Sequence, residues 1–188
     1  HDEASHGALA PERLIVTADG RLVVTEYVLG PALEQLQFAP SRYWQELRIA
    51  LPAGAAHAPL DRRADVAQLG AIALALIVGR PLREDEYPPR ISEIVDSVRA
   101  ISATGLEPLP TAVRGWLRSA LQLDPRRSFA SATEAHAALD GIFDVDERTA
   151  RQALRAFAAT CQETLFHEDT VVEPPGRPVA PSLGAVGA

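Results

Sequence analysis

The most apolar segment of the chain is ADVAQLGAIALALIV at positions 64–78, where hydrophobic residues fall on nearly every face of a helix. Such a helix is stable only when other elements surround it, so the segment predicts a buried helix at the centre of a domain. Gly79 follows at once, and glycine is the residue best suited to the left-handed conformation that ends a helix. We therefore expect the remaining elements to pack around this segment.

Four more helices are predicted after the central one. The first three begin at Ser92, Thr111 and Ser131, whose hydroxyls can accept hydrogen bonds from free backbone N–H groups. In the last helix, Asp144 and Glu147 are placed as a capping box. Apolar residues recur there at three-and-four spacing, at Ala150, Leu154, Phe157, Cys161 and Leu165. The predicted helices cover residues 92–103, 111–122, 131–142 and about 147–166.

The region before the central helix has a different pattern. Two β-branched runs, RLIV at 13–16 and RLVVTE at 21–26, flank an Asp-Gly pair that suits a tight turn, so they predict a β-hairpin. Prolines and glycines interrupt residues 28–59, which favours a long loop with at most a short helical turn at 32–37. If this loop leaves its aromatic residues exposed, they would suit a protein interface. Those residues are Phe38, Tyr43 and Trp44.

Composition narrows the functional classes. The net charge of -7 argues against a nucleic-acid partner, because affinity for phosphate backbones depends on clustered cations. No window reaches the roughly 20 apolar residues of a membrane helix, and no signal peptide opens the chain, so a cytoplasmic location is expected. The single Cys161 excludes an internal disulfide framework. The five histidines lack the paired spacing of metal sites, so no metal is expected.

Several motifs follow one another in an order that is typical of one family. HGALAPER at 6–13 resembles the catalytic loop H-R-D-L-K-P-E-N of protein kinases, and TEYV at 25–28 stands where kinases have D-F-G. LPA at 51–53 stands at the A-P-E position, with only its proline kept. DRRADVAQLG at 61–70, GRPL at 79–82 and LDPRRSF at 123–129 resemble the later landmarks. Residues 6–143 thus resemble the C-terminal lobe of a bacterial Ser/Thr protein kinase.

The resemblance implies that the residues needed for phosphoryl transfer have been replaced. Transfer needs a carboxylate near the acceptor hydroxyl, an Asn and an Asp on Mg²⁺, a Lys on the phosphates and a Gly-rich cover. Here the base position is Ala8, the Asn position is Arg13 and the Asp position is Glu26. The chain has no lysine and no G-x-G-x-x-G loop. We therefore expect no enzymatic activity, no cofactor and no bound ATP.

The same resemblance implies a structural role for other positions. Asp65 would accept hydrogen bonds from the loop backbone near His6, and Tyr27 would stack on that histidine. Arg127 matches the family arginine that pairs with the A-P-E glutamate, which is Ala53 here, so it needs another acceptor or water. Because the resemblance places Arg13 and Glu26 at the former metal site, we predict an ion pair between them at about 3 Å, which would replace Mg²⁺ by an internal cation. The alternative is that both charges are merely solvated.

These observations give a fold class and a function as expectations. Residues 1–143 are expected to form an α+β, mostly α, kinase-like C-lobe whose N-lobe is absent, 144–167 an extension helix, and 168–188 a flexible Pro/Gly-rich linker. The run Arg83-Glu84-Asp85-Glu86 is expected to be a solvated loop, or less simply a docking patch. The function implied is a pseudokinase scaffold or regulatory module that binds a protein partner in bacterial signalling. The alternatives are an atypical nucleotide-binding enzyme that needs the missing N-lobe, and a helical interaction domain with a chance motif.

Overall fold

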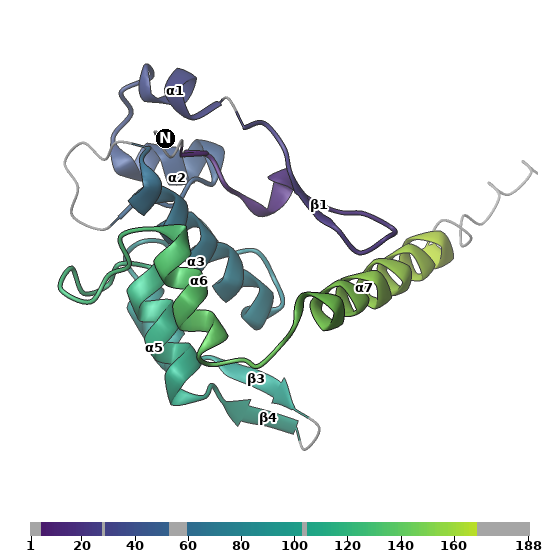
Figure 1. The fold of residues 1–188 in the computed structure, drawn as a ribbon. Helices are drawn as coiled ribbons and strands as arrows, with labels where there is room; N and C mark the ends of the chain where they lie inside the picture. Colours follow the sequence, from purple (N-terminus) through teal and green to yellow (C-terminus); the bar gives the residue numbers. More distant parts are fainter. Residues whose placement is uncertain (1–4, 28, 53–59, 103–104, 169–188) are drawn as a thin grey trace, which may run out of the picture.

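The computed structural model describes residues 5–27, 29–52, 60–102 and 105–168. Its fold is α+β and mostly helical, and two small antiparallel sheets lie outside the helical cluster (Figure 1). A 3₁₀ turn, Pro11–Arg13, precedes the first strand. The strands are β1 Leu14–Val16, β2 Leu22–Val24, β3 Arg99–Ser102 and β4 Gly105–Pro108. The helices are α1 Leu29–Glu34, α2 Pro40–Leu47, α3 Arg62–Val78, α4 Ile91–Ser97, α5 Thr111–Ala120, α6 Ala132–Asp140 and α7 Glu147–Glu168.

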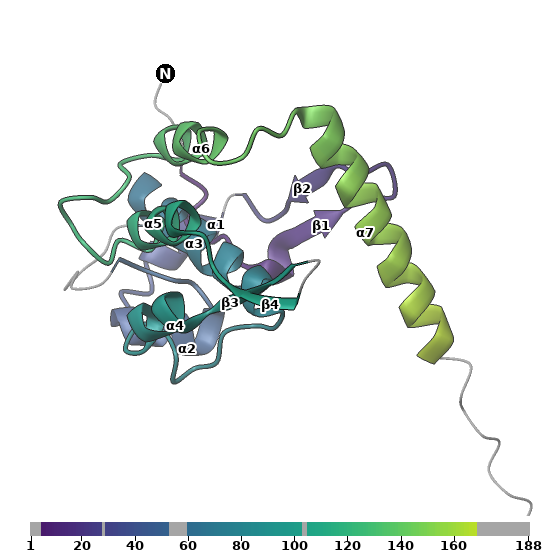
Figure 2. The ribbon, with the colours of Figure 1, turned by 90° about the horizontal axis from the view of Figure 1, so that it is seen from below.

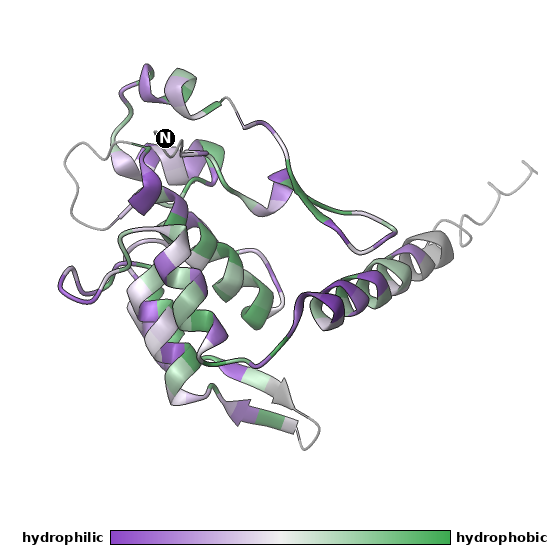
Figure 3. Cartoon of the chain, viewed as in Figure 1, coloured by the Kyte–Doolittle hydropathy of each residue, from purple (hydrophilic) through white to green (hydrophobic). Residues whose placement is uncertain are grey.

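Helix α3 is the buried central helix that the apolar pattern predicts. The side chain of Asp61 caps its first turn by accepting from the backbone N–H groups of Arg63 and Ala64. Its last turn ends at Gly79, which adopts a left-handed φ of 76° as expected. Figure 3 shows α3 hydrophobic along much of its length. Helices α5 and α6 pack against it and against each other, and the Trp116 indole N–H donates to the Ala135 carbonyl between them.

The predicted N-terminal hairpin is confirmed, and it lies apart from the helical cluster (Figures 1 and 2). Leu14 pairs with Val24 and Val16 with Leu22 around a turn that places Gly20 at a φ of 77°. Helix α7 packs along this hairpin. A Cβ atom on Gly20 would clash with the carbonyl oxygen of Arg151, so the contact requires glycine.

The prediction of a long loop at 28–59 is wrong for α2, whereas α1 overlaps the short helical turn allowed at 32–37. Pro40 is the first residue of α2, a position where proline starts a helix rather than breaking it. The exposure on which the possible aromatic interface depended is absent at two of its three residues, because Tyr43 and Trp44 are each only 5% exposed. Phe38 is half-buried against Tyr43, with the Arg42 guanidinium 3.9 Å from the centre of its ring. The residues of 53–59 lie outside the described part.

The helix predicted at 92–103 is wrong in its second half. Helix α4 ends at Ser97, and β3 and β4 then form a second hairpin in which Arg99 pairs with Pro108. Gly105, at a φ of 125°, marks the turn side of this hairpin. The signal was present in the glycine, but the preceding run RAIS is too short to separate a strand from a helix by its pattern.

The predicted caps are only partly confirmed. The Ser131 hydroxyl does accept from the backbone N–H of Glu134 at 3.2 Å. Helices α4 and α5, in contrast, begin after Arg90 and Pro110, and neither Ser92 nor Thr111 acts as the cap. At α7 the N–H of Thr149 donates to Asp146 at 2.7 Å, so Asp146 takes the role expected of Asp144.

Helix α7 stands out from the rest of the molecule as the predicted extension, with the hairpin as its neighbour in both views (Figures 1 and 2). Of its predicted apolar stripe, Leu154 and Cys161 are half-buried, whereas Ala150 and Phe157 are exposed. Ala158, which the pattern did not single out, is the buried position. Helix α7 includes Glu168, and the rest of the expected linker lies outside the described residues. None of the described helices is both long enough and apolar enough to cross a membrane.

Candidate functional site

The segment of residues 6–10, called here the anchored loop, is held to α3 by a carboxylate. The backbone N–H of His6 donates to one oxygen of Asp65 at 2.8 Å, and that of Gly7 donates to the other at 2.6 Å. Burial raises the pKa of Asp65, and these two hydrogen bonds oppose the rise. The predicted role of Asp65 as acceptor for the loop backbone is therefore confirmed.

Gln68 is a second anchor of the loop that the sequence reasoning missed. Its side-chain oxygen accepts from the Leu9 N–H at 2.6 Å, and its amide group donates to the Gly7 carbonyl at 3.2 Å. The side chain is buried, so these bonds satisfy polar atoms that water does not reach. A signal existed, because Gln68 and Asp65 are three residues apart on one face of an otherwise apolar helix.

His6 joins the anchored loop to the end of the N-terminal hairpin. Its Nδ1 accepts from the Ala8 N–H at 3.2 Å, which leaves Nε2 to donate to the Thr25 carbonyl at 2.9 Å. Tyr27 contacts the imidazole edge-on, with ring centroids 6.0 Å apart. The predicted contact between His6 and Tyr27 is present, but Tyr27 is 57% exposed and does not form a buried stack.

Ala8 is the residue that the kinase resemblance aligns with the catalytic base. Its side chain is fully buried in a small cluster with Tyr43, Ile49 and Leu60. A methyl group accepts no proton, and its surroundings are apolar. The anchored loop therefore presents no general base from this position.

Arg13 and Glu26 form the ion pair that we predicted. The Nε atom of Arg13 lies 2.6 Å from Oε2 of Glu26, and Nη1 of Arg13 also donates to the Ala8 carbonyl at 3.3 Å. The Arg13 side chain is 16% exposed and that of Glu26 is 51% exposed. The backbone of Glu26 has a left-handed φ of 63°, a conformation that is uncommon for residues other than glycine. The guanidinium of Arg13 thus neutralises the carboxylate of Glu26 at the end of the hairpin.

Arg127 is not brought to this site. It lies between α5 and α6 and is exposed, while its backbone N–H closes a local turn on the Asp124 carbonyl at 3.0 Å. Ala53, its expected neighbour, is outside the described residues. Of the two outcomes that we considered for Arg127, the structure shows the one in which the side chain faces water.

The run at 83–86 is not the solvated loop that we expected. Glu86 is buried, and it accepts from Arg80 at 2.7 and 2.9 Å and from the Arg83 N–H at 2.7 Å. The paired Arg80 guanidinium, aided by the Arg83 N–H, lowers the pKa of Glu86 to about 2. Glu84 and Asp85, in contrast, are exposed. The run of charged residues suggested exposure for all four positions, so the burial of Glu86 could not be recognised from the sequence.

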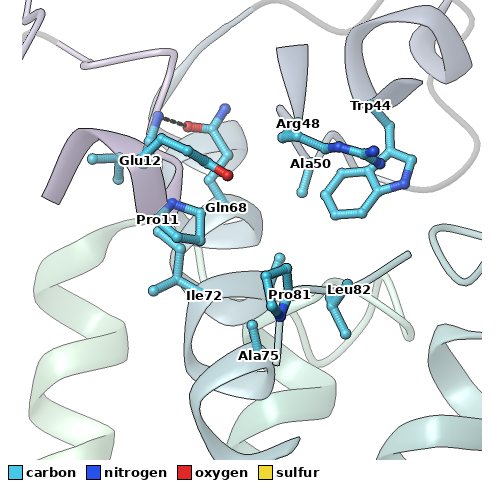
Figure 4. A pocket seen from close by; sticks show the side chains of 12 residues that line it. Pro11, Glu12, Trp44, Arg48, Ala50, Gln68, Ile72, Ala75, Pro81 and Leu82 are labelled. Carbon is cyan, nitrogen blue, oxygen red and sulfur yellow. Dashed lines mark hydrogen bonds between the residues drawn. The ribbon is translucent and has the colours of Figure 1, made fainter. Parts of the chain in front are cut away.

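A pocket opens beside the anchored loop, between α2 and α3 (Figure 4). Its volume is about 500 Å³ with its open mouth included. Glu12 and Arg48 lie on opposite sides of it, and Trp44 lies next to Arg48. Apolar side chains that include Ile72, Ala75 and Leu82 form the floor between them (Figure 4). Among the described residues, no cluster of His, Cys, Asp and Glu side chains could hold a metal ion.

No protein-family model, curated protein or solved structure matches this chain.

Proposed function

We propose that the chain is a catalytically inactive, kinase-like module that works by binding a protein partner as a scaffold or regulatory element in bacterial signalling. The observation that carries the proposal is the ion pair between Arg13 and Glu26 at 2.6 Å. In a working kinase, the carboxylate at the Glu26 position and an amide at the Arg13 position would hold Mg²⁺. An arginine stays charged at any ordinary pH, so it excludes a divalent cation from the same carboxylate.

The surroundings of the pair support the same conclusion. Ala8 contributes only a buried methyl group where a carboxylate would have to accept a proton. Asp65 and Gln68 nevertheless keep the loop in a defined conformation through four hydrogen bonds. A loop that is held this firmly but lacks reactive groups suits recognition better than catalysis.

A thermal-shift titration with ATP and Mg²⁺ tests the proposal. A ligand that binds only the folded chain stabilises it by about 2.7 kcal/mol when its concentration is one hundred times its Kd. For a chain of this size that corresponds to a rise of roughly 5 to 10 °C in Tm. We expect no saturable rise at millimolar ATP, with or without Mg²⁺.

ATP with a chelator in place of Mg²⁺ is the matched control. A saturable rise that requires Mg²⁺ would favour the atypical nucleotide-binding enzyme instead. That rise should disappear in Glu26→Gln if the carboxylate holds the metal.

A further inference from the structure

Strand β2 of the N-terminal hairpin is apolar and open to solvent. Leu22, Val23 and Val24 are all exposed, although each is a large apolar residue. Among the described residues β2 pairs only with β1, and the hairpin projects from the helical cluster (Figure 1). A two-stranded hairpin is at best marginally stable in water, and an exposed apolar edge is a template on which a further strand can pair.

The hydrogen bonds of the hairpin show which backbone groups of β2 point outward. The N–H of Thr25 donates to the Arg13 carbonyl on the β1 side at 3.0 Å. Bonded and non-bonded pairs alternate along an antiparallel ladder, so Val23 is bonded to β1 and its two neighbours are not. The N–H and carbonyl groups of Leu22 and Val24 therefore point away from β1, and they have no hydrogen bond to a described residue.

The charges at the two ends of β2 suit a second copy of the same strand. The segment RLVVTE at 21–26 begins with a cation, ends with an anion and is apolar between them. Beside an antiparallel copy, Arg21 of each chain lies at the Glu26 end of the other, whereas a parallel copy would place like charges together. The Glu26 side chain is half-exposed, and Arg13 uses only one of its carboxylate oxygens. The strand is thus complementary to itself in the antiparallel direction.

We propose that β2 pairs with β2 of a second copy of the chain, which joins the two hairpins into one antiparallel sheet about a two-fold axis. Val23 of each copy lies at the axis, and Leu22 of one copy faces Val24 of the other. In this register every outward-pointing N–H and carbonyl group of these two residues is bonded. The paired strands are short, so the association is weak, as in interfaces that bury less than about 1,200 Å². The inference goes beyond the proposed function and does not rest on it.

Sedimentation velocity of the whole chain measures the association. The apparent mass should rise toward twice that of the monomer as the concentration increases from micromolar to millimolar. Val24→Pro removes an outward N–H from each copy and leaves the bonds between β1 and β2 in place, so it should raise the dissociation constant at least about tenfold. A parent chain that stays monomeric at millimolar concentration overturns the inference and leaves β2 as an edge for a segment of another protein.

A disulfide between copies tests the register without the proline variant. Cys161→Ser first removes the one native thiol. In that background Val23→Cys places two thiols opposite each other at the axis, where the Cα atoms of a non-bonded pair lie about 4.5 Å apart and a disulfide can form. Ile15→Cys is the matched control, because Ile15 is 50% exposed and faces Val23 across the ladder, one strand farther from the axis. Under mild oxidation, Val23→Cys should give several-fold more covalent dimer than Ile15→Cys on a non-reducing gel.

Contrary results in the cross-linking experiment also overturn the inference. Equal amounts of covalent dimer from the two cysteine variants would mean that the thiols meet by random collision. More dimer from Ile15→Cys than from Val23→Cys would mean that the copies meet through another surface. None of these outcomes bears on the ATP titration, so failure of this inference and failure of the inactive-kinase proposal are distinguishable.

Discussion

The anchored loop and the N-terminal hairpin adjoin each other but are stabilised in different ways. The loop is fixed to α3 by buried or half-buried side chains whose bonds to the backbone are all satisfied. The hairpin exposes Ile15, Leu22 and Val24, and its contact with the loop runs through His6 and Arg13. Most of its apolar surface therefore contributes little to the core.

The two regions therefore differ in role: the contacts of Asp65 hold the fold together, whereas the pair of Arg13 and Glu26 lies where the proposal places the lost chemistry. The carboxylate of Asp65 accepts hydrogen bonds from the backbone N–H groups of His6 and Gly7, and this arrangement needs neither metal nor nucleotide. Glu26 lies in a half-exposed position, where its carboxylate pairs with the Arg13 guanidinium at 2.6 Å. Substitutions in the first region should thus change folding stability, and substitutions in the second should change it little.

Asp65→Ala should have the largest effect. It leaves the N–H groups of His6 and Gly7 without acceptors in a part-buried site, so we expect a loss of about 3 kcal/mol in the free energy of unfolding. Urea denaturation followed by circular dichroism measures it. Asp140→Ala, which removes an exposed carboxylate on α6, is the matched control and should stay within about 0.5 kcal/mol. Equal losses in both variants would show that the loop is not held by Asp65.

Glu86→Gln should come next, with a loss of about 2 kcal/mol, because it weakens the bonds to Arg80 and Arg83 in a buried site. The pair also makes stability depend on pH. The pKa of Glu86 falls from 4.5 to about 2 on folding, so between these values the unfolded chain binds the extra proton. The stability from the pair is complete above pH 4.5 and is lost as the pH falls toward 2.

Denaturation midpoints at several pH values between 6 and 2 check this dependence. The loss of stability toward low pH should be shallower in Glu86→Gln than in the parent chain. Asp85→Asn, which changes an exposed neighbour, should keep the parent slope. An unchanged slope in Glu86→Gln would contradict the role given to the buried pair.

Arg13→Ala should have the smallest effect on stability, at most about 1 kcal/mol, because its partner Glu26 is half-exposed and screened by water. The same variant frees the Glu26 carboxylate. The thermal denaturation midpoint measures the change, and Arg21→Ala in the hairpin is the control. A loss as large as that of Asp65→Ala would mean that the ion pair holds the hairpin in place.

The sequence pattern predicted correctly those elements whose conformation is determined by local signals, namely the central helix and the first hairpin. Helix α3 was predicted because its sequence is hydrophobic on all faces, and Gly79 ended it by backbone conformation alone. The first hairpin followed from its Asp-Gly turn. The ion pair between Arg13 and Glu26 was predicted because the kinase resemblance places both residues at the former metal site.

What the sequence hid depends on tertiary contacts. Tyr43 and Trp44 lie in a Pro-rich segment, and only the packing of α2 against the core shows that they are buried. In the sequence Glu86 cannot be told from its solvated neighbours, and only the fold shows that it is buried and paired with Arg80. Arg48 and Glu12 are 36 positions apart, so no local pattern could place them at one pocket. The kinase resemblance itself remains a hypothesis that rests on motif order and on the contacts of Asp65.

Transfer of phosphate from radiolabelled ATP tests the central claim most directly. The purified chain is incubated with Mg²⁺, labelled ATP and casein as a general acceptor, beside the same chain carrying Glu26→Gln. In our proposal Ala8 and Arg13 stand at the positions of the acid and the amide that transfer needs, so we predict no label above the heat-inactivated control. Label that appears with the parent chain and disappears with Glu26→Gln would contradict the account.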